Sequence, residues 1–282
     1  MPAHNYIHPE KGNQLKQLHH NGKLLILPNI WDSLGAVMLE SLGYPAVATA
    51  SASIAFSNGY PDGEKISFND LLFVLQKIVQ SVKIPVTADI ESGYAENNSI
   101  LKENIRKLID VGIAGINFED SHHNDKTIIP IETQCERIGL IRQTAIEMGM
   151  PLFINARTDV FLKANQLSDE EKLSEVIRRG KDYKDSGADG FYPILLKKKE
   201  DIETVIKEVT LPVNILLLPG IPDFEVLKII GVVRLSLGPG FLKTAINAMK
   251  NLAGKLLLNE GMNEVTDNPV TSAYLNNLIS KK

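Results

Sequence analysis

The segment PVTADIESG (residues 85–93) is followed thirty positions later by the segment GINFEDS (residues 115–121). Each is a short apolar run that ends abruptly in acidic side chains. These acids are Asp89, Glu91, Glu119 and Asp120. In parallel α/β proteins the chemistry lies at the carboxyl ends of buried strands. The two segments therefore predict a parallel sheet with an acidic site at its carboxyl edge.

Short apolar runs alternate with longer amphipathic ones along the whole chain. The short runs predict strands over residues 23–27, 46–50, 86–88, 115–118, 152–156, 190–193, 213–216 and 233–236. The longer runs predict helices over residues 33–41, 67–81, 99–111, 133–148, 168–186, 198–209, 223–230 and 240–256. Ser67 and Ser168 are expected as N-caps, and Glu171 completes a capping box with Ser168.

Eight strands and eight helices in strict alternation favour an α/β fold of the (β/α)8 TIM-barrel type over an open doubly wound sheet. No Gly-x-Gly-x-x-Gly follows the first strand, which weakens the dinucleotide-binding alternative further. We expect one barrel domain over residues 1–256 and a helical tail over 257–282. The tail has helix-like apolar spacing at Val270, Tyr274, Leu275 and Leu278. It is expected to pack on a neighbouring subunit or to lie as a simple surface helix.

Composition excludes several classes of function. The chain has 282 residues, a net charge of −4 and 44% hydrophobic residues, with no basic stripe, so neither nucleic acid nor an anionic membrane is an expected partner. The single cysteine, Cys135, excludes an internal disulfide and fits a reducing compartment. The first twenty residues have no apolar segment typical of secretion. A cytoplasmic location is expected.

The acids are the first candidate site. Asp89 and Glu91 lie two positions apart and therefore point to the same side of an extended strand. Glu119 follows the next strand, and Asp62 lies in the turn-rich loop SNGYPDGEK. Four carboxylates at neighbouring strand ends repel one another unless a cation holds them, and Mg²⁺ binds such oxygen ligands. The alternative is that single acids cap helices or pair with lysines.

Other polar residues lie where a ligand of that cation would bind. Arg157, in the segment NARTD, is a candidate clamp for a substrate carboxylate, with an ion pair to Asp159 as the alternative. The small residues Ser51, Ala52 and Ser53 would allow a ligand to approach backbone N–H groups. Asn214 is a candidate hydrogen-bond donor to the same ligand, with a backbone role equally expected.

Two further groups have competing interpretations. His122 and His123 are candidate acid–base residues or solvated loop residues. The glycines of residues 238–240 would form either a phosphate site or an ordinary turn. Cys135 falls in an expected amphipathic helix, where burial is a better explanation than nucleophilic chemistry.

Five segments in one order (PNIWDSLGA, GYPD, ADIESGY, GINFEDS and NARTD) resemble the isocitrate lyase and phosphoenolpyruvate mutase superfamily over about residues 25–240. The resemblance implies a (β/α)8 barrel whose last helix is exchanged between subunits of a homodimer or homotetramer. It also implies Mg²⁺ and a 2-oxo acid or phosphonate substrate. By motif, Asp89 is similar to the direct metal ligand, and Asp62, Glu91 and Glu119 to ligands that act through water. Arg157 resembles the family arginine that contacts the substrate. Residues 51–53 resemble the family's backbone cradle for the substrate carboxylate.

The chain also departs from that pattern. Isocitrate and methylisocitrate lyases carry a Lys-(Lys/Arg)-Cys-Gly-His loop after the position of Glu119, whereas this chain reads SHHNDKTIIPIE. That difference argues against cleavage of those tricarboxylates. Phosphonopyruvate-processing members carry Lys-x-Asn in the loop, but Thr127 and Ile128 follow Lys126 here. The metal and cradle half of the pattern is retained, and the half that closes over substrate and delivers a proton is altered.

Three hypotheses follow. The first is a Mg²⁺-dependent lyase or mutase that cleaves a C–C or P–C bond, or moves a phosphoryl group, through a metal-bound enolpyruvate. His122, His123 or Lys126 would then move the proton. The second is a non-catalytic oxo-acid-binding protein on the same scaffold. The third, an isomerase of phosphorylated sugars, explains residues 238–240 but not the acids.

Overall fold

The computed structural model describes residues 7–122 and 127–280. Its strands are β1 (Leu25–Leu27), β2 (Asn29–Ile30), β3 (Val47–Thr49), β4 (Val86–Asp89), β5 (Gly115–Glu119), β6 (Phe153–Thr158), β7 (Gly190–Pro193), β8 (Asn214–Leu216) and β9 (Arg234–Ser236). All ladders between these strands are parallel, in the orders β2-β3-β4-β5-β6-β7 and β1-β9-β8.

The two ladders form one closed barrel. β1 and β2 are consecutive pieces of a single barrel strand, separated by Pro28, which lacks the N–H needed to continue a ladder. At the other end, a parallel bridge between Phe191 and Val213 joins β7 to β8. Because β1 pairs with β9 and β2 pairs with β3, the eight barrel strands close into a ring. The predicted (β/α)8 fold is confirmed.

The helices are α1 (Pro9–Leu18), α2 (Ser33–Ser41), α3 (Ser51–Ser57), α4 (Phe68–Ser81), α5 (Asn98–Asp110), α6 (Ile131–Glu147), α7 (Val160–Lys163), α8 (Asp169–Asp185), α9 (Lys199–Val209), α10 (Phe224–Ile229), α11 (Gly240–Leu257), α12 (Met262–Thr266) and α13 (Ser272–Ser280). Ser67 caps α4, and Ser168 with Glu171 forms the predicted capping box of α8. The predictions did not include α1, α3 and α7.

Along β5, apolar side chains that face the surrounding helices alternate with polar side chains that face the inside of the barrel. Ile116 and Phe118 are fully buried, and the Phe118 ring lies 5.0 Å from the guanidinium carbon of Arg137, which belongs to the surrounding helix α6. Asn117 faces the opposite way and accepts a hydrogen bond of 2.8 Å from Asn155 of β6. Apolar side chains therefore pack between sheet and helices, while the inward positions are polar and end in Glu119.

Helix α1 closes the amino-terminal end of the barrel. Leu15 is fully buried against Gly115, where an added Cβ would lie 2.6 Å from the Leu15 side chain. His19, which follows the helix, stacks on Phe153 with ring centroids 3.9 Å apart. Gly115 and Phe153 are the first residues of their strands, so this end of the barrel is covered and any site must lie at the other. In the described part of the chain, no helix is long and apolar enough to cross a membrane.

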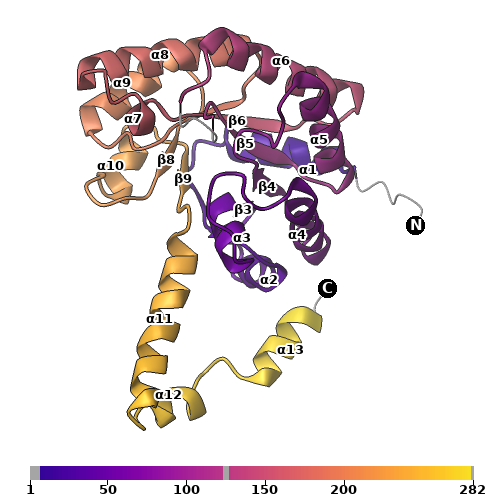
Figure 1. The fold of residues 1–282 in the computed structure, drawn as a ribbon, viewed down its shortest axis with the longest axis vertical. Coiled ribbons are helices and arrows are strands. Elements are labelled where there is room, and N and C mark those ends of the chain that lie inside the picture. The colour runs from indigo at the N-terminus through magenta and orange to yellow at the C-terminus, as the bar shows by residue number, and fades with distance from the viewer. Residues whose placement is uncertain (1–6, 123–126, 281–282) are drawn as a thin grey trace.

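The last helices leave the barrel instead of completing its outer ring. α11 extends away from the barrel, and α12 and α13 return toward α2, forming a C-terminal arm of residues 240–280 (Figure 1). Leu242, in the first turn, is the only buried residue of α11. The domain bounds expected from the sequence, a barrel over residues 1–256 and a tail over 257–282, stay a prediction, as does the exchange of the last helix between subunits.

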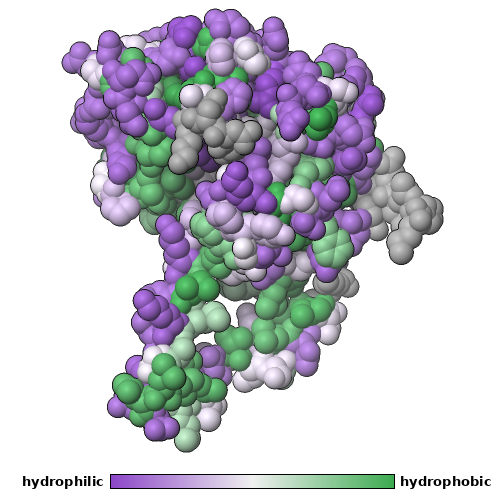
Figure 2. Space-filling model, viewed as in Figure 1, coloured by the Kyte–Doolittle hydropathy of each residue, from purple (hydrophilic) through white to green (hydrophobic). Residues whose placement is uncertain are grey.

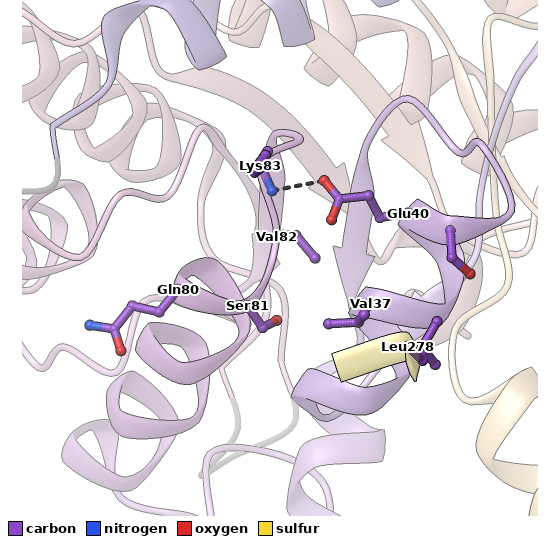
Figure 3. Close-up of a pocket in the computed structure, with 8 residues that line it drawn as sticks. Val37, Glu40, Gln80, Ser81, Val82, Lys83 and Leu278 are labelled. Atoms are coloured by element: carbon purple, nitrogen blue, oxygen red, sulfur yellow. Dashed lines mark hydrogen bonds between the residues drawn. The ribbon is translucent and has the colours of Figure 1, made fainter. Parts of the chain in front are cut away.

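The end of the arm docks on helix α2 of its own chain. Figure 3 shows Leu278 of α13 beside Val37 of α2, at the edge of a cavity of about 310 Å³. Of the four apolar residues of the tail pattern, Leu278 is buried and Leu275 half-buried, whereas Val270 and Tyr274 are exposed. The tail therefore contacts the chain's own barrel but leaves much of its apolar surface uncovered.

Candidate functional site

A cavity of about 170 Å³ lies at the carboxyl ends of the strands. Acidic and other polar residues from five segments line it, namely Ser51, Asp62, Glu91, Glu119, Arg157 and Asp159. Ser51 begins α3, Glu119 ends β5, and Arg157 lies near the end of β6. The structure thus brings most of the predicted site residues to one place, as the barrel topology requires.

Asp89 ends β4 and has one oxygen in use and one without a partner. Its Oδ2 atom accepts hydrogen bonds from Ser51 N at 3.3 Å and Ser51 Oγ at 3.0 Å. Its backbone N–H donates to Thr49 Oγ1 at 3.1 Å, which fixes the end of the strand. Its Oδ1 atom is buried and has no hydrogen-bond partner among the described residues. A buried carboxylate oxygen without a donor is the chemical setting in which a cation is expected.

Glu91 is fixed by neighbours that the sequence did not single out. Its Oε2 atom accepts a hydrogen bond from Glu64 N at 2.8 Å, and its Oε1 atom accepts one from the Tyr94 hydroxyl at 2.9 Å. Glu64 in turn accepts hydrogen bonds from Ser92 and from Tyr94 N. Hydrogen bonds between the loop after α3 and the loop after β4 thus hold the carboxylates of Glu64 and Glu91 in place.

The backbone around these carboxylates is strained. Glu64, Glu91 and Tyr94 have φ values of 56°, 50° and 53°, a region that residues with a Cβ seldom adopt. Gly93 also has a positive φ, and an added Cβ there would lie 2.6 Å from Leu101. Such conformations cost about 1–3 kcal/mol each and persist where the surroundings enforce them, often at functional sites.

Arg157 is held between two carboxylates. Its Nη1 atom lies 2.8 Å from Glu119 Oε2, and its Nε atom donates to Asp159 Oδ1 at 2.7 Å. Burial alone would raise the pKa of Asp159, but the Arg157 charge and the hydrogen bond from Ser121 hold that pKa below its ordinary value. The expected alternative, an ion pair with Asp159, is therefore present. It orients the guanidinium along the wall of the cavity.

A second buried ion pair supports Asp159 from behind. Asp120 is fully buried and accepts hydrogen bonds from Thr158, from Asp159 N, and from Arg179 and Tyr183 of α8. Burial raises the pKa of Asp120, and the Arg179 charge opposes that shift. Through Asp159 N, at 2.8 Å, this network fixes the segment that positions Arg157.

The predicted cradle and its neighbours have specific partners. Ser51, Ala52 and Ser53 form the first turn of α3 rather than a loop, and the Ser51 N–H is engaged by Asp89. Asn214 is buried and exchanges hydrogen bonds with Ser236, so it faces another side chain rather than the cavity. The N–H groups of Leu237 and Gly238 both donate to Asn29 Oδ1, which counts against a phosphate site there.

The predicted acid–base residues lie beside the cavity. His122 is exposed and lines an adjoining cavity of about 550 Å³, together with Glu64 and Tyr94. His123 and Lys126 lie outside the described residues. Cys135 is half-buried in α6, and burial raises the pKa of its thiol, in keeping with a structural role.

The donor set fits a hard divalent cation that keeps most of its water. In residues 7–122 and 127–280, no three His, Cys, Asp or Glu side chains are grouped closely enough to bind one ion together. Asp89 offers one unpartnered oxygen, and Asp62, Glu91 and Glu119 line the cavity. One direct carboxylate with further acids acting through water is a common arrangement for Mg²⁺.

Comparisons with known proteins agree with the motifs. The family model described as phosphoenolpyruvate phosphomutase matches residues 15–257. An uncharacterized protein of Mycobacterium tuberculosis (strain ATCC 25618 / H37Rv) is 30% identical over 221 residues, which are 78% of this chain and 80% of that protein. The 2-methylisocitrate lyase of Bacillus subtilis (strain 168) is 23% identical over 210 residues, which are 72% of this chain and 66% of the lyase.

A solved structure is also similar over most of its length. The crystal structure of a protein from Burkholderia cenocepacia J2315, provisionally named a phosphonomutase, has a TM-score of 0.83 and 36% identity. The match covers 87% of this chain and 99% of that one. The resemblance inferred from the sequence motifs is thus confirmed, and the chain belongs to the phosphoenolpyruvate phosphomutase family.

Proposed function

We propose that this protein is a Mg²⁺-dependent enzyme that makes or breaks a C–C or P–C bond in a small 2-oxo acid or its phosphono analogue. The observation that carries the proposal is the buried Oδ1 atom of Asp89, which has no hydrogen-bond partner among the described residues. Asp89 is bound to Ser51, which lines the cavity together with carboxylates and Arg157. The relatives by sequence include a protein named 2-methylisocitrate lyase, and that name supports this class of reaction.

Each residue has a stated role in this proposal. Asp89 would hold the cation directly, and Asp62, Glu91 and Glu119 would hold it through water. A bound divalent cation supplies Lewis-acid stabilisation of the negative charge that develops on the oxygens of a 2-oxo acid. Arg157, fixed by Glu119 and Asp159, would bind an anionic group of the substrate or its leaving group.

Residues at the rim of the cavity would exclude water and transfer the proton. Lys163 and Leu162 of α7 line the same cavity as Arg157 and would cover a bound ligand from that side. His122 is the described candidate for moving a proton, because it lines the adjoining cavity at the exit of β5. His123 and Lys126 remain proposals of the same kind.

A direct test is turnover of oxaloacetate, phosphonopyruvate and 2-methylisocitrate by the full chain, with and without Mg²⁺. We expect turnover of at least one small 2-oxo acid or phosphonate that disappears in EDTA and returns with Mg²⁺. We expect none with 2-methylisocitrate, since the loop motif of the lyases is missing. Failure to turn over any of them, with oxo-acid binding intact, would leave the second candidate function.

That second candidate is a non-catalytic protein that binds oxo acids on the same scaffold. The altered segment SHHNDKTIIPIE favours it, because the group that delivers a proton in the lyases has no counterpart there. Titration calorimetry with pyruvate or oxalate and Mg²⁺ distinguishes such a binder from an inert scaffold. Binding that is lost in Asp89→Ala would support it.

We propose that the partner of this chain is a second copy of itself. The C-terminal arm carries large apolar side chains that are more than 45% exposed, namely Ile246, Met249, Leu256, Leu257, Leu258, Met262 and Val265. Figure 2 shows hydrophobic residues gathered at the end of the arm and an open space between arm and barrel. A surface of this kind on one chain is expected to be covered in the working protein.

The assembly can be tested by light scattering of the full chain, whose protomer mass is 31.1 kDa. We expect twice or four times that mass, and we expect Met249→Glu to give the single protomer mass, because the charge would be buried in the interface. Lys250→Glu, at the exposed neighbouring position, is the matched control and should leave the assembly intact. A monomeric wild-type protein at micromolar concentration would refute the assembly.

A further inference from the structure

Arg234 is a buried arginine on a barrel strand and is not among the residues that line the candidate cavity. It begins β9, where its Cα pairs with Leu25 of β1 and with Asn214 of β8, and it is 1% exposed. The charges of Tyr192 in β7 and Asp89 at the end of β4 raise the pKa of Arg234, and the Arg234 charge lowers the pKa of His19 behind α1. Strands β4, β7 and β9 belong to the same closed barrel, so we take its interior to be where these charges interact.

The guanidinium of Arg234 lacks the partners that other buried arginines have. Its Nε, Nη1 and Nη2 atoms are buried and make no hydrogen bond with the described residues. By contrast, Arg157 pairs with Asp159, Arg179 with Asp120, and Arg137 donates to the Ser92 carbonyl. Burying a cation without a partner is costly, so a group that balances Arg234 is expected in the working protein.

Arg234 keeps its charge at neutral pH. Burial lowers its pKa to about 10, while Tyr192 and Asp89 raise it. Asp89 is the carboxylate whose charge raises the pKa of Arg234, yet Asp89 and Arg234 form no ion pair. If a divalent cation binds Asp89, that carboxylate is neutralised from the cavity side. Among the described residues, Asp89 is the only carboxylate whose charge acts on Arg234, so an anionic group of a ligand near the cation would supply the balance that Asp89 gives up.

We propose that Arg234 is a specificity-determining residue that favours ligands with two anionic groups over ligands with one. The inference rests on the proposed function, because it places the ligand at Asp89. Charges in a dry interior interact more strongly than in water and are little screened by salt. The second anionic group of the ligand would thus be stabilised by the charge of Arg234 at a distance, without contacting it. Tyr192 of β7, whose charge also acts on Arg234, pairs in register with Arg157, which lines the cavity.

The test compares oxalate, with two carboxylates, and pyruvate, with one, by titration calorimetry in Mg²⁺. Arg234→Met removes the charge and keeps much of the volume, and such replacements of buried charges are often neutral for stability. We expect Arg234→Met to weaken oxalate binding about tenfold or more, which corresponds to about 1.4 kcal/mol. We expect it to weaken pyruvate binding less than about threefold. Arg234→Lys should retain most of the preference.

Two controls keep the result interpretable. Arg178→Met removes an exposed arginine on α8 and should change neither affinity. Arg234→Gln provides a second neutral variant, should the methionine variant not fold. Equal losses for both ligands, or no loss for either, would overturn the role of Arg234 and leave the proposed function standing. Wild-type protein that binds neither ligand would overturn the proposed function, and this inference with it.

Discussion

Asp89→Asn is expected to reduce Mg²⁺-dependent turnover by about a thousandfold or more, since Lewis-acid stabilisation is worth several kcal/mol and each 1.36 kcal/mol is tenfold in rate. The asparagine carbonyl can still accept the hydrogen bonds from Ser51, so the turn into α3 should survive. What is lost is the negative charge on the oxygen that has no hydrogen-bond partner among the described residues.

The measurement is the steady-state rate over a range of Mg²⁺ concentrations, together with the unfolding curve of each variant. Asp185→Asn is the matched control, because it makes the same change at an exposed position at the end of α8. It should leave the rate unaltered. An Asp89→Asn enzyme with full activity and an unchanged Mg²⁺ requirement would show that Asp89 is not the metal ligand.

Arg179→Met is expected to lower the free energy of unfolding by about 3–5 kcal/mol, because it leaves the buried Asp120 carboxylate without its cation. Arg178→Met, the adjacent control, breaks only an exposed pair with Glu175 and should cost about 0–1 kcal/mol. Urea unfolding of the variants measures both values.

A double-variant cycle separates the ion pair from the rest of the network. Adding Asp120→Asn to Arg179→Met should recover part of the lost stability, since no uncompensated charge then remains buried. Equal effects of Arg178→Met and Arg179→Met would contradict the account. Arg179→Met should also lower activity, because the Asp120 network fixes Asp159 and hence Arg157.

The barrel was predictable because its signal is repeated. Eight apolar runs alternating with amphipathic ones permit few architectures, and the acids after 86–88 and 115–118 must then meet at one end of the barrel. The pairing of Arg157 was also foreseeable as one of two alternatives, because Asp159 lies two positions away. In both cases the spacing of residues along the chain was sufficient for the prediction.

Other features depend on contacts that spacing does not encode. Residues 51–53 carry no amphipathic pattern, so α3 was not predicted, and Glu64 and Tyr94 reach Glu91 only through strained loops. The periodicity of α11 predicts a helix but not where its apolar face packs. In the sequence Arg234 is one charged residue in an apolar strand, and only the structure shows that it is buried without a hydrogen-bond partner in residues 7–122 and 127–280.

The most direct test of a cation held by Asp89 is a crystal of the full chain grown with Mn²⁺ and oxalate, with diffraction data collected at the manganese edge. We predict one anomalous peak within coordination distance of Asp89 Oδ1, with waters between the ion and Glu91 and Glu119. Oxalate bound elsewhere, with no anomalous density beside Asp89, would contradict the account.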